Sequence, residues 1–441
     1  MRPLEWCLVL AFLPLILVAF GPPAWRRHWR LLGVIPFLVM LLQIVLEGWR
    51  WQLVPLYLLA PIIPLMALIT RGRRAARWAR LASGVVLAGI LLGSAILAGW
   101  VLPVITLPAP TGPYAVGVMD REMVDTSRDR RLMATIWYPA TEPGEPAPWT
   151  HYPDQLMAGL ANLTGMPGMV FQHLRYIDVT ASDGVSILDN GQPFPVLVFS
   201  HGMVGMRLQN ASMLQDLASW GYVVVALDHT DAAAATTFPD GETRFYDPTR
   251  FGLPANEPPS ANAVETNVFP VWVEDQQFAF DTLETWQVND PVFAGKLDLA
   301  HLGAFGHSFG GATSLEVCRI DDRCQAAADL DGGLYGGMVA HPASRPMLLV
   351  SSASSGNDHE ARAKWRDAIE RAQGPALWLE LPGSSHLSFT DSEMLSPLLP
   401  PPGFDPRSGL AKVDHDLRTF FDTYVRGSAE SGSYVLPSVS P

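Results

Sequence analysis

The distribution of hydrophobic positions divides the chain into two parts. Residues 1–105 contain long apolar stretches, each close to the ~20 residues that a helix needs to cross the hydrocarbon core of a bilayer. The four stretches lie at residues 6–22, 31–47, 51–70 and 81–103. The flank of the first, "GPPAWRRHW", has no small-residue cleavage site, which favours a retained helix over a signal peptide. The pattern predicts a region of about four transmembrane helices.

Arginines cluster in the two loops that would lie on one side of such a region. Three of them fall within residues 26–30, and the segment "RGRRAARWAR" at 71–80 holds five more. Positively charged loops stay in the cytoplasm. Because one predicted span separates the 71–80 cluster from residues 106–441, we expect those residues to lie outside the cytoplasm. The predicted location is a bacterial inner membrane, with the body of the chain in the periplasm.

Residues 106–441 show strands in alternation with helices. The run "PFPVLVFSHG" at 193–202 is continuously apolar, as is typical of a strand covered on both faces. Further strands are predicted in "RRLMATIWYPA" (130–140), "LASWGYVVVALDHTD" (217–231), "QAAADLDGG" (325–333), "RPMLLVSSAS" (345–354) and "GPALWLELPGSSH" (374–386). This alternation predicts one α/β domain with a mostly parallel sheet covered by helices on both faces. The segment 153–174 is expected to be a helical insertion, either over a substrate pocket or against the core.

The charge balance argues against a nucleic-acid partner. The chain has 30 basic and 43 acidic residues, and residues 1–105 contain ten of the basic residues but only two of the acidic ones. The remaining body is therefore strongly acidic and unsuited to binding phosphate backbones. Cys318 and Cys324 lie six residues apart and would form a disulfide in an oxidising compartment, with two unrelated thiols as the alternative. They lack the second ligand pair that a zinc site requires, so no metal is predicted.

The motif Gly306-His307-Ser308-Phe309-Gly310 fits G-x-S-x-G, the sharp turn that presents a nucleophilic serine at the end of a buried strand. The apolar run "HLGAF" precedes the serine and "GATSLEV" follows it, as the strand and helix around such a turn require. Side chains at either glycine position would collide with neighbouring elements. We therefore predict Ser308 as a catalytic nucleophile, with a chance glycine-rich turn as the alternative.

A serine hydroxyl needs a histidine base that is held in place by a carboxylate. His386 follows the last apolar strand in "LPGSSH", where a loop can reach back over the sheet, and it is the predicted base. Two aspartates follow strands after the nucleophile, Asp331 in "DLDGG" and Asp358 in "SSGND". We favour Asp331 as the acid. Asp329 is expected to point to the opposite face if its strand continues that far.

An oxyanion hole requires two backbone amides that converge on one point. The residue after the nucleophile, Phe309, is predicted to supply one amide. Met203 is predicted to supply the other, because Gly202 lets the backbone turn inward after "VLVFSHG". Structural roles are expected for three other histidines: His201, His229 and His415.

Six stretches in this order resemble the platelet-activating factor acetylhydrolase family (plasma, isoform II type) and its bacterial α/β-hydrolase relatives. They are "GPYAVG", "VLVFSHGMVGMR", "DLASWGYVVVALDHTD", "GHSFGGAT", "DLDGG" and "GSSHLSFTD". The resemblance implies an α/β-hydrolase fold and hydrolysis of short or oxidised acyl chains from phospholipids, without a metal or other cofactor. By the family's motifs, Ser308, Asp331 and His386 would form the triad, and the amides of Met203 and Phe309 would form the oxyanion hole.

The predicted function is therefore that of a membrane-anchored serine ester hydrolase acting on short-chain or lipid-like esters. A substrate that partitions into the bilayer is concentrated near a tethered site, which gives the membrane region a purpose. The expected partners are a hydrophobic ester or lipid and the bilayer itself. The alternatives are an acyltransferase, a polyester-cleaving or other carboxylesterase with the same triad, and a non-catalytic membrane sensor.

Overall fold

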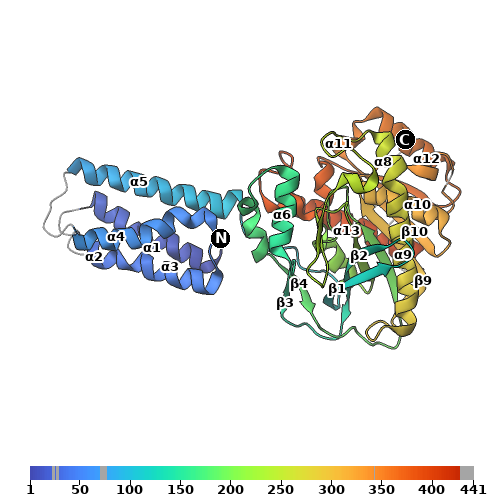
Figure 1. Ribbon diagram of the computed structural model, residues 1–441, viewed down its shortest axis with the longest axis horizontal. Helices are drawn as coiled ribbons and strands as arrows, with labels where there is room; N and C mark the ends of the chain where they lie inside the picture. The colour runs from blue at the N-terminus through green and yellow to red at the C-terminus, as the bar shows by residue number, and fades with distance from the viewer. Residues whose placement is uncertain (22–24, 26–28, 70–76, 342, 428–441) are drawn as a thin grey trace. The chain divides into compact units, whose positions relative to one another are not determined.

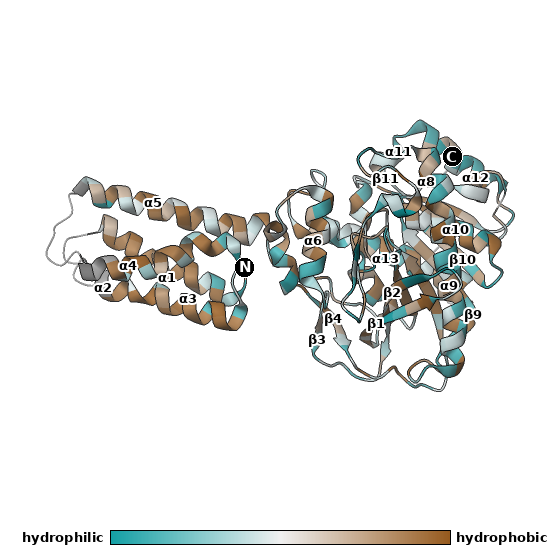
Figure 2. Ribbon diagram, in the orientation of Figure 1, coloured by the Kyte–Doolittle hydropathy of each residue, from teal (hydrophilic) through white to brown (hydrophobic). Residues whose placement is uncertain are grey.

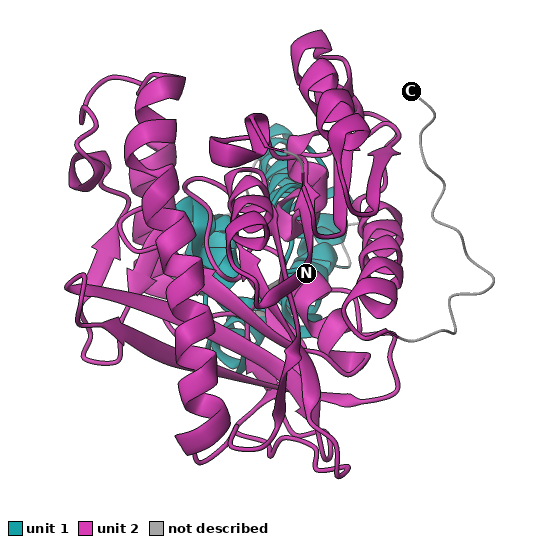
Figure 3. Cartoon of the chain, turned by 90° about the vertical axis from the view of Figure 1, so that its right-hand side faces the viewer, with its two compact units in different colours: residues 1–105, 169–176, 395–398 teal, residues 106–168, 177–394, 399–441 magenta. Residues whose placement is uncertain are grey.

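The computed structural model describes residues 1–21, 25, 29–69, 77–341 and 343–427. The chain forms two compact units, which Figure 3 distinguishes by colour. The first unit comprises Met1–Ile105, Met169–Tyr176 and Leu395–Leu398, and the second comprises Thr106–Gly168, Ile177–Met394 and Leu399–Pro441. Each unit has an apolar core of its own.

The apolar stretches of the first unit form helices, but only two of the described helices are long and apolar enough to cross a membrane, Pro3–Phe20 and Trp78–Val101. The helices are α1 (Pro3–Phe20), α2 (Trp29–Leu32), α3 (Val34–Glu47), α4 (Val54–Ile69) and α5 (Arg77–Ile96), the last continued by η3 (Leu97–Val101). α3 has 14 residues and ends at Gly48, whose φ is 75°. α4 has 16 residues and contains Pro61 and Pro64, which remove helical N–H donors. The prediction of four transmembrane helices is therefore wrong.

The positively charged loops of the sequence analysis fall largely outside the described residues. Those that lie there are Arg26, Arg27, Arg71, Arg73 and Arg74. The orientation that they predict is thus an argument from sequence alone.

A buried ion pair joins the helix ends of the first unit. Arg50 and Glu5 are both fully buried, and their charged atoms lie 3.1 Å apart. The short 3-10 helix η4 (Gly168–Tyr176) also contacts this region, because the Gln172 side-chain oxygen accepts the Trp51 N–H at 3.1 Å. The predicted insertion at 153–174 therefore consists of two parts. Its first part forms α6 of the second unit, and its last part belongs to η4 of the first unit.

The second unit is built on a ten-stranded sheet in the order β12-β11-β10-β9-β5-β6-β2-β1-β4-β3. Figure 1 labels some of these strands, among them β9 and β10. The strands are β1 (Ala115–Asp125), β2 (Arg130–Ala140), β3 (Pro146–Pro148), β4 (Asp178–Asp183), β5 (Phe194–Ser200), β6 (Val223–Asp228), β9 (Leu297–His307), β10 (Cys324–Leu330), β11 (Met347–Ser352) and β12 (Ala376–Leu381), with β7 (Ala235–Thr237) and β8 (Thr243–Phe245) in a separate pair. The six strands from β12 to β6 in this order run parallel, whereas β2 is antiparallel to both β6 and β1. The predicted α/β class with a mostly parallel sheet is confirmed.

Helices cover both faces of this sheet. They are α6 (Pro153–Thr164), α7 (Ala211–Ser219), α8 (Ala261–Asn267), α9 (Phe269–Asn289), α10 (Phe309–Ile320), α11 (Ala353–Gly356), α12 (His359–Arg371) and α13 (Pro406–Tyr424). Consecutive residues of β9 point to different helical layers: Ala304 belongs to the same core as Trp272 of α9, whereas the Phe305 ring lies 5.7 Å from Phe421 of α13. Because both faces are buried, β5 and β6 contain the continuous apolar runs "VLVF" and "VVVAL" rather than an alternation of apolar and polar residues.

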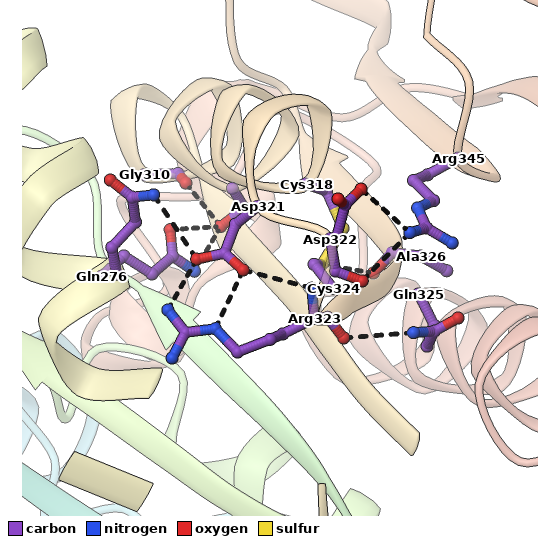
Figure 4. Close-up of a disulfide and its surroundings, with 12 residues drawn as sticks. Gln276, Gly310, Cys318, Asp321, Asp322, Arg323, Cys324, Gln325, Ala326 and Arg345 are labelled. Atoms are coloured by element: carbon purple, nitrogen blue, oxygen red, sulfur yellow. Dashed lines mark hydrogen bonds and ion pairs between the residues drawn. A yellow bond between two sulfur atoms is a disulfide. The ribbon is translucent and has the colours of Figure 1, made fainter. Parts of the chain in front are cut away.

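A disulfide closes the turn between α10 and β10 (Figure 4). Cys318 lies near the end of α10, and Cys324 is the first residue of β10. Within this turn, the Asp321 carboxylate accepts hydrogen bonds from the Arg323 guanidinium at 2.7 and 2.9 Å. The pairing that the sequence left open is therefore formed, and it joins the helix that follows Ser308 to the strand that precedes Asp331.

We predict that this disulfide stabilises the second unit. Replacing both Cys318 and Cys324 by alanine should lower the free energy of unfolding by about 2 kcal/mol, because closing a loop of this length restricts the unfolded chain. Denaturant unfolding of the full chain in detergent measures the effect. Cys7→Ala, which removes the free cysteine, is the control. An unchanged unfolding midpoint in the double variant would contradict the prediction.

Candidate active site

A single residue, Ser308, joins β9 to α10, and its backbone is strained. Its φ is 56° and its ψ is −123°, a conformation that residues with a side chain seldom adopt. The turn is tight enough that a β-carbon placed on Gly306 would lie 2.3 Å from the carbonyl carbon of Gly310. A β-carbon on Gly310 would lie 2.2 Å from the carbonyl oxygen of Ser200 at the end of β5. Both glycines of the motif are therefore required by main-chain contacts.

The three residues predicted as a triad lie together at the carboxyl edge of the sheet. The Ser308 Oγ is 3.0 Å from Nε2 of His386, and Nδ1 of His386 is 2.7 Å from a carboxylate oxygen of Asp331. The Asp331 side chain is fully buried, whereas that of His386 is 46% exposed. When Asp331 is ionised, Nδ1–H donates to it, and Nε2 is left to accept the Ser308 proton.

Two serines that the sequence analysis missed hold the Asp331 carboxylate. The Ser352 N–H donates to one carboxylate oxygen at 2.6 Å, and the Ser355 hydroxyl donates to the other at 3.0 Å. Both serines belong to the run "SSASS" (351–355), which spans the end of β11 and the start of α11; β11 is the parallel neighbour of β10. A polar run at the carboxyl end of the adjacent strand was the available signal. These donors orient the acid toward His386.

The other two aspartates have different environments. Asp358 is the N-cap of α12, and its carboxylate accepts the N–H groups of Glu360 and Ala361. The Asp329 carboxylate is buried and accepts the Gly332 N–H at 2.8 Å, but its second oxygen has no hydrogen-bond partner among the described residues. Burial, together with the nearby charge of Asp331, raises the pKa of Asp329 well above its usual range. This environment therefore favours the uncharged form of the Asp329 carboxyl group.

The two predicted oxyanion amides lie beside the nucleophile. A β-carbon on Gly202 would be 3.3 Å from Cβ of Ser308, so the turn that carries Met203 passes directly against that residue. The Met203 N–H makes no hydrogen bond to any described residue. Phe309 is the first residue of α10, where no preceding turn of helix supplies a carbonyl for its N–H. Both amides can therefore donate to a bound group.

The other buried histidines near the sheet edge form structural contacts. His201 donates through Nδ1 to the Gly202 carbonyl at 2.7 Å and accepts the His229 N–H at 3.2 Å, and burial lowers the pKa of His201 to about 3. The His229 ring stacks on Trp272 at 3.9 Å and lies 3.1 Å from the Asp275 carboxylate. Across the described part of the chain, no three histidine, cysteine or acidic side chains are grouped to hold a metal ion.

Comparison with a solved structure gives the class of protein. The chain is similar to a ferulic acid esterase from Streptomyces cinnamoneus, with a TM-score of 0.61, 26% identity, and coverage of 77% of this chain and 97% of the esterase. Together with the mixed α/β sheet, this similarity supports a carboxylic ester hydrolase.

Sequence comparison gives the family. Residues 101–245 and 283–400, more than half of the chain, match the family model of platelet-activating factor acetylhydrolase, isoform II, and the protein belongs to this family. It is 25% identical over 317 residues to the platelet-activating factor acetylhydrolase of Cavia porcellus, covering 65% of this chain and 69% of the relative. It is 26% identical over 318 residues to a probable 1-alkyl-2-acetylglycerophosphocholine esterase of Arthroderma benhamiae, covering 65% and 76%. The protein is thus a carboxylic ester hydrolase.

The two neighbouring aspartates of β10 and its following turn give a matched test. Asp331→Asn should lower kcat by a factor on the order of 10³ to 10⁴, because an amide does not hold the required tautomer of the histidine. Asp329→Asn should stay close to the wild type, because burial favours the uncharged form of Asp329 and an amide has a similar shape to that form. Steady-state hydrolysis of a p-nitrophenyl ester measures both variants.

Asp358→Asn is a second control. Asparagine caps a helix as well as aspartate does, so this variant should retain activity and stability. Loss of activity in Asp358→Asn, with activity retained in Asp331→Asn, would move the acid to the later strand.

Proposed function

We propose that the protein is a serine ester hydrolase that cleaves short-chain or lipid-like carboxylic esters, including acyl groups of phospholipids, with Ser308, His386 and Asp331 as its triad. The observation that carries the proposal is the hydrogen-bonded relay of 3.0 Å from Ser308 to His386 and 2.7 Å from His386 to Asp331. The names of the relatives, among them a 1-alkyl-2-acetylglycerophosphocholine esterase, support the substrate class.

In the proposed acylation step, the Ser308 Oγ attacks the ester carbonyl carbon while Nε2 of His386 accepts the hydroxyl proton. The carbonyl oxygen becomes negative, and the N–H groups of Met203 and Phe309 donate to it. The N-terminus of α10 adds a favourable dipole at this position. His386 then gives its proton to the departing alcohol, which leaves the acyl group bound to Ser308.

Deacylation repeats these roles with water. His386 accepts a proton from the attacking water, the same two amides stabilise the second negative oxygen, and the proton returns to Ser308 as the carboxylic acid leaves. Asp331 stays ionised throughout and stabilises the imidazolium that forms in each step.

Ser308→Ala should abolish this chemistry. We expect hydrolysis of p-nitrophenyl esters by the full chain in detergent to fall by a factor on the order of 10⁴ to 10⁶. A fluorophosphonate probe should label the wild type and not the variant, while the two melt at similar temperatures. A series of esters from acetate to palmitate then defines the preferred acyl length. Full activity in Ser308→Ala would overturn the proposal.

We further propose that α1 and α5 anchor the protein in a bacterial inner membrane with the hydrolase body on the periplasmic side. These two helices have the length and composition of membrane spans, and most of their residues are coloured as hydrophobic in Figure 2. Leu10, Leu17, Val85 and Leu92 are each more than half exposed, as lipid-facing residues would be in the absence of a bilayer. The arginine-rich sequence 71–80 includes the first four residues of α5, which favours a cytoplasmic start for that helix.

The Cys318–Cys324 disulfide is independent support for this orientation, because disulfides persist in the periplasm and are rare in the cytosol. Protease added to intact spheroplasts should degrade the hydrolase body, whereas inside-out vesicles should protect it. A maleimide reagent should label Cys318 and Cys324 only after reduction. Protection in spheroplasts would place the body in the cytoplasm.

A further inference from the structure

A buried glutamine lies between two segments of the candidate active site. Gln209 is 6% exposed and lies in the loop between β5 and α7. Its side-chain oxygen accepts the Gly202 N–H at 3.3 Å, directly before Met203. Its side-chain NH₂ donates to Nδ1 of His307 at 3.2 Å and to the Asn210 side-chain oxygen at 3.1 Å. The side-chain amide of Gln209 therefore bonds to three residues that lie in or next to the candidate site: Gly202, His307 and Asn210.

The contact with Gln209 determines which nitrogen of His307 carries the proton. Because Nδ1 accepts from an amide, the proton of the neutral ring lies on Nε2, which donates to the main-chain carbonyl of His386 at 2.9 Å. His307 is buried, and burial with the nearby His386 ring lowers the pKa of His307 to about 4. The ring therefore keeps this tautomer at neutral pH.

The turn on one side of Gln209 is strained. Val204, the residue after Met203, has a φ of 57°, a conformation that is an outlier for a β-branched residue. Its N–H donates to the Ala232 carbonyl at 3.1 Å. Strain of this kind persists only where surrounding contacts impose it. The packing of Gln209 is one such contact, since a β-carbon on Gly205 would lie 2.1 Å from the Gln209 side-chain oxygen.

The segment on the other side, residues 386–391, contains the proposed base. Besides the bond from His307 to the His386 carbonyl, the Asn210 side-chain NH₂ donates to the Phe389 carbonyl at 2.5 Å. The Asp391 N–H donates to the main-chain carbonyl of Gln209 at 2.9 Å. Three bonds thus connect this segment to Gln209 and its direct partners.

We propose that Gln209 and His307 are a positioning pair. Together they fix the positions of the Met203 amide and the His386 imidazole relative to Ser308. One amide side chain supports the turn with the oxyanion donor, and through the His307 ring it supports the segment with the base. Neither residue touches the reacting atoms, so both are positioning residues and not catalytic ones. The inference rests on the proposed function, because it assigns these two residues to the same site.

A double-mutant cycle in the full chain tests the pair. Gln209→Met and His307→Phe each remove the hydrogen bonds while keeping similar volume. We expect each variant to lower kcat about 10- to 100-fold with KM nearly unchanged, because small displacements of the amide and the base act on the transition state. The double variant should be no slower than the slower single variant, because either change breaks the same connection.

Conservative variants separate positioning from general destabilisation. His307→Gln can still donate to the His386 carbonyl and should recover most of kcat, whereas the shorter His307→Asn should not. Gln276→Met is the matched control, because Gln276 is fully buried and donates to Ser314 at 3.2 Å, whereas neither His307 nor the segment 386–391 is among its described hydrogen-bond partners. It should lower the melting temperature and leave kcat close to the wild type.

If the fold-decreases in kcat of the two single variants multiply in the double variant, the proposal of a positioning pair is wrong. Equal activities of His307→Gln and His307→Asn would also overturn it. The second comparison decides the matter by itself if His307→Phe does not fold. Failure of the proposed function is distinguishable, because Ser308→Ala would then keep its activity in the same assay, whereas failure of this inference alone would leave Ser308→Ala inactive.

Discussion

The close approach of main-chain segments around Ser308 is the constraint on which the candidate site depends. A β-carbon on Gly332, after β10, would lie 2.3 Å from the Ser308 carbonyl oxygen, and one on Gly310 would lie equally close to the end of β5. The serine therefore has a conformation that costs on the order of 1–3 kcal/mol, and three paired strands impose it. The same crowding directs the hydroxyl out of the sheet edge toward His386. The proposed proton transfer from Ser308 to His386 therefore depends on this turn.

Electrostatics at this edge depend on contacts that are local in space and distant in sequence. Asp329 and Asp331 are separated by one residue, and both are buried. Asp331 receives hydrogen bonds from Ser352 and Ser355, whereas Asp329 has one backbone donor and an oxygen without a partner among the described residues. The Asp331 carboxylate is thus oriented by donors, whereas burial favours the uncharged form of Asp329. The difference comes from the last residue of β11 and from α11, which supply the donors to Asp331.

The disulfide and the site lie at opposite ends of the same two elements. α10 begins after Ser308 and ends near Cys318, and β10 begins at Cys324 and ends before Asp331. A covalent link at one end therefore limits the relative movement of nucleophile and acid at the other end.

The sequence by itself determined the fold class, the position of the nucleophile turn and the order of serine, aspartate and histidine. These features follow from local patterns: apolar runs of strand length, and glycines that a tight turn requires in a fixed spacing. They predicted Ser308, Asp331 and His386 as neighbours, and the structure brings these three residues together. The position of the strands favoured Asp331 over Asp358, and the family resemblance strengthened that choice.

Only the tertiary structure decided the serines that hold Asp331, the contacts of Gln209 with His307, and the lengths of the apolar helices. Gln209 lies 98 residues from its partner His307, and no sequence pattern links them. The four apolar stretches were recognised, but where each helix begins and ends depended on single residues such as Gly48. Hydrophobic periodicity reports which face of an element is buried. It does not report which polar groups meet when distant elements pack, because that depends on the geometry of the whole sheet.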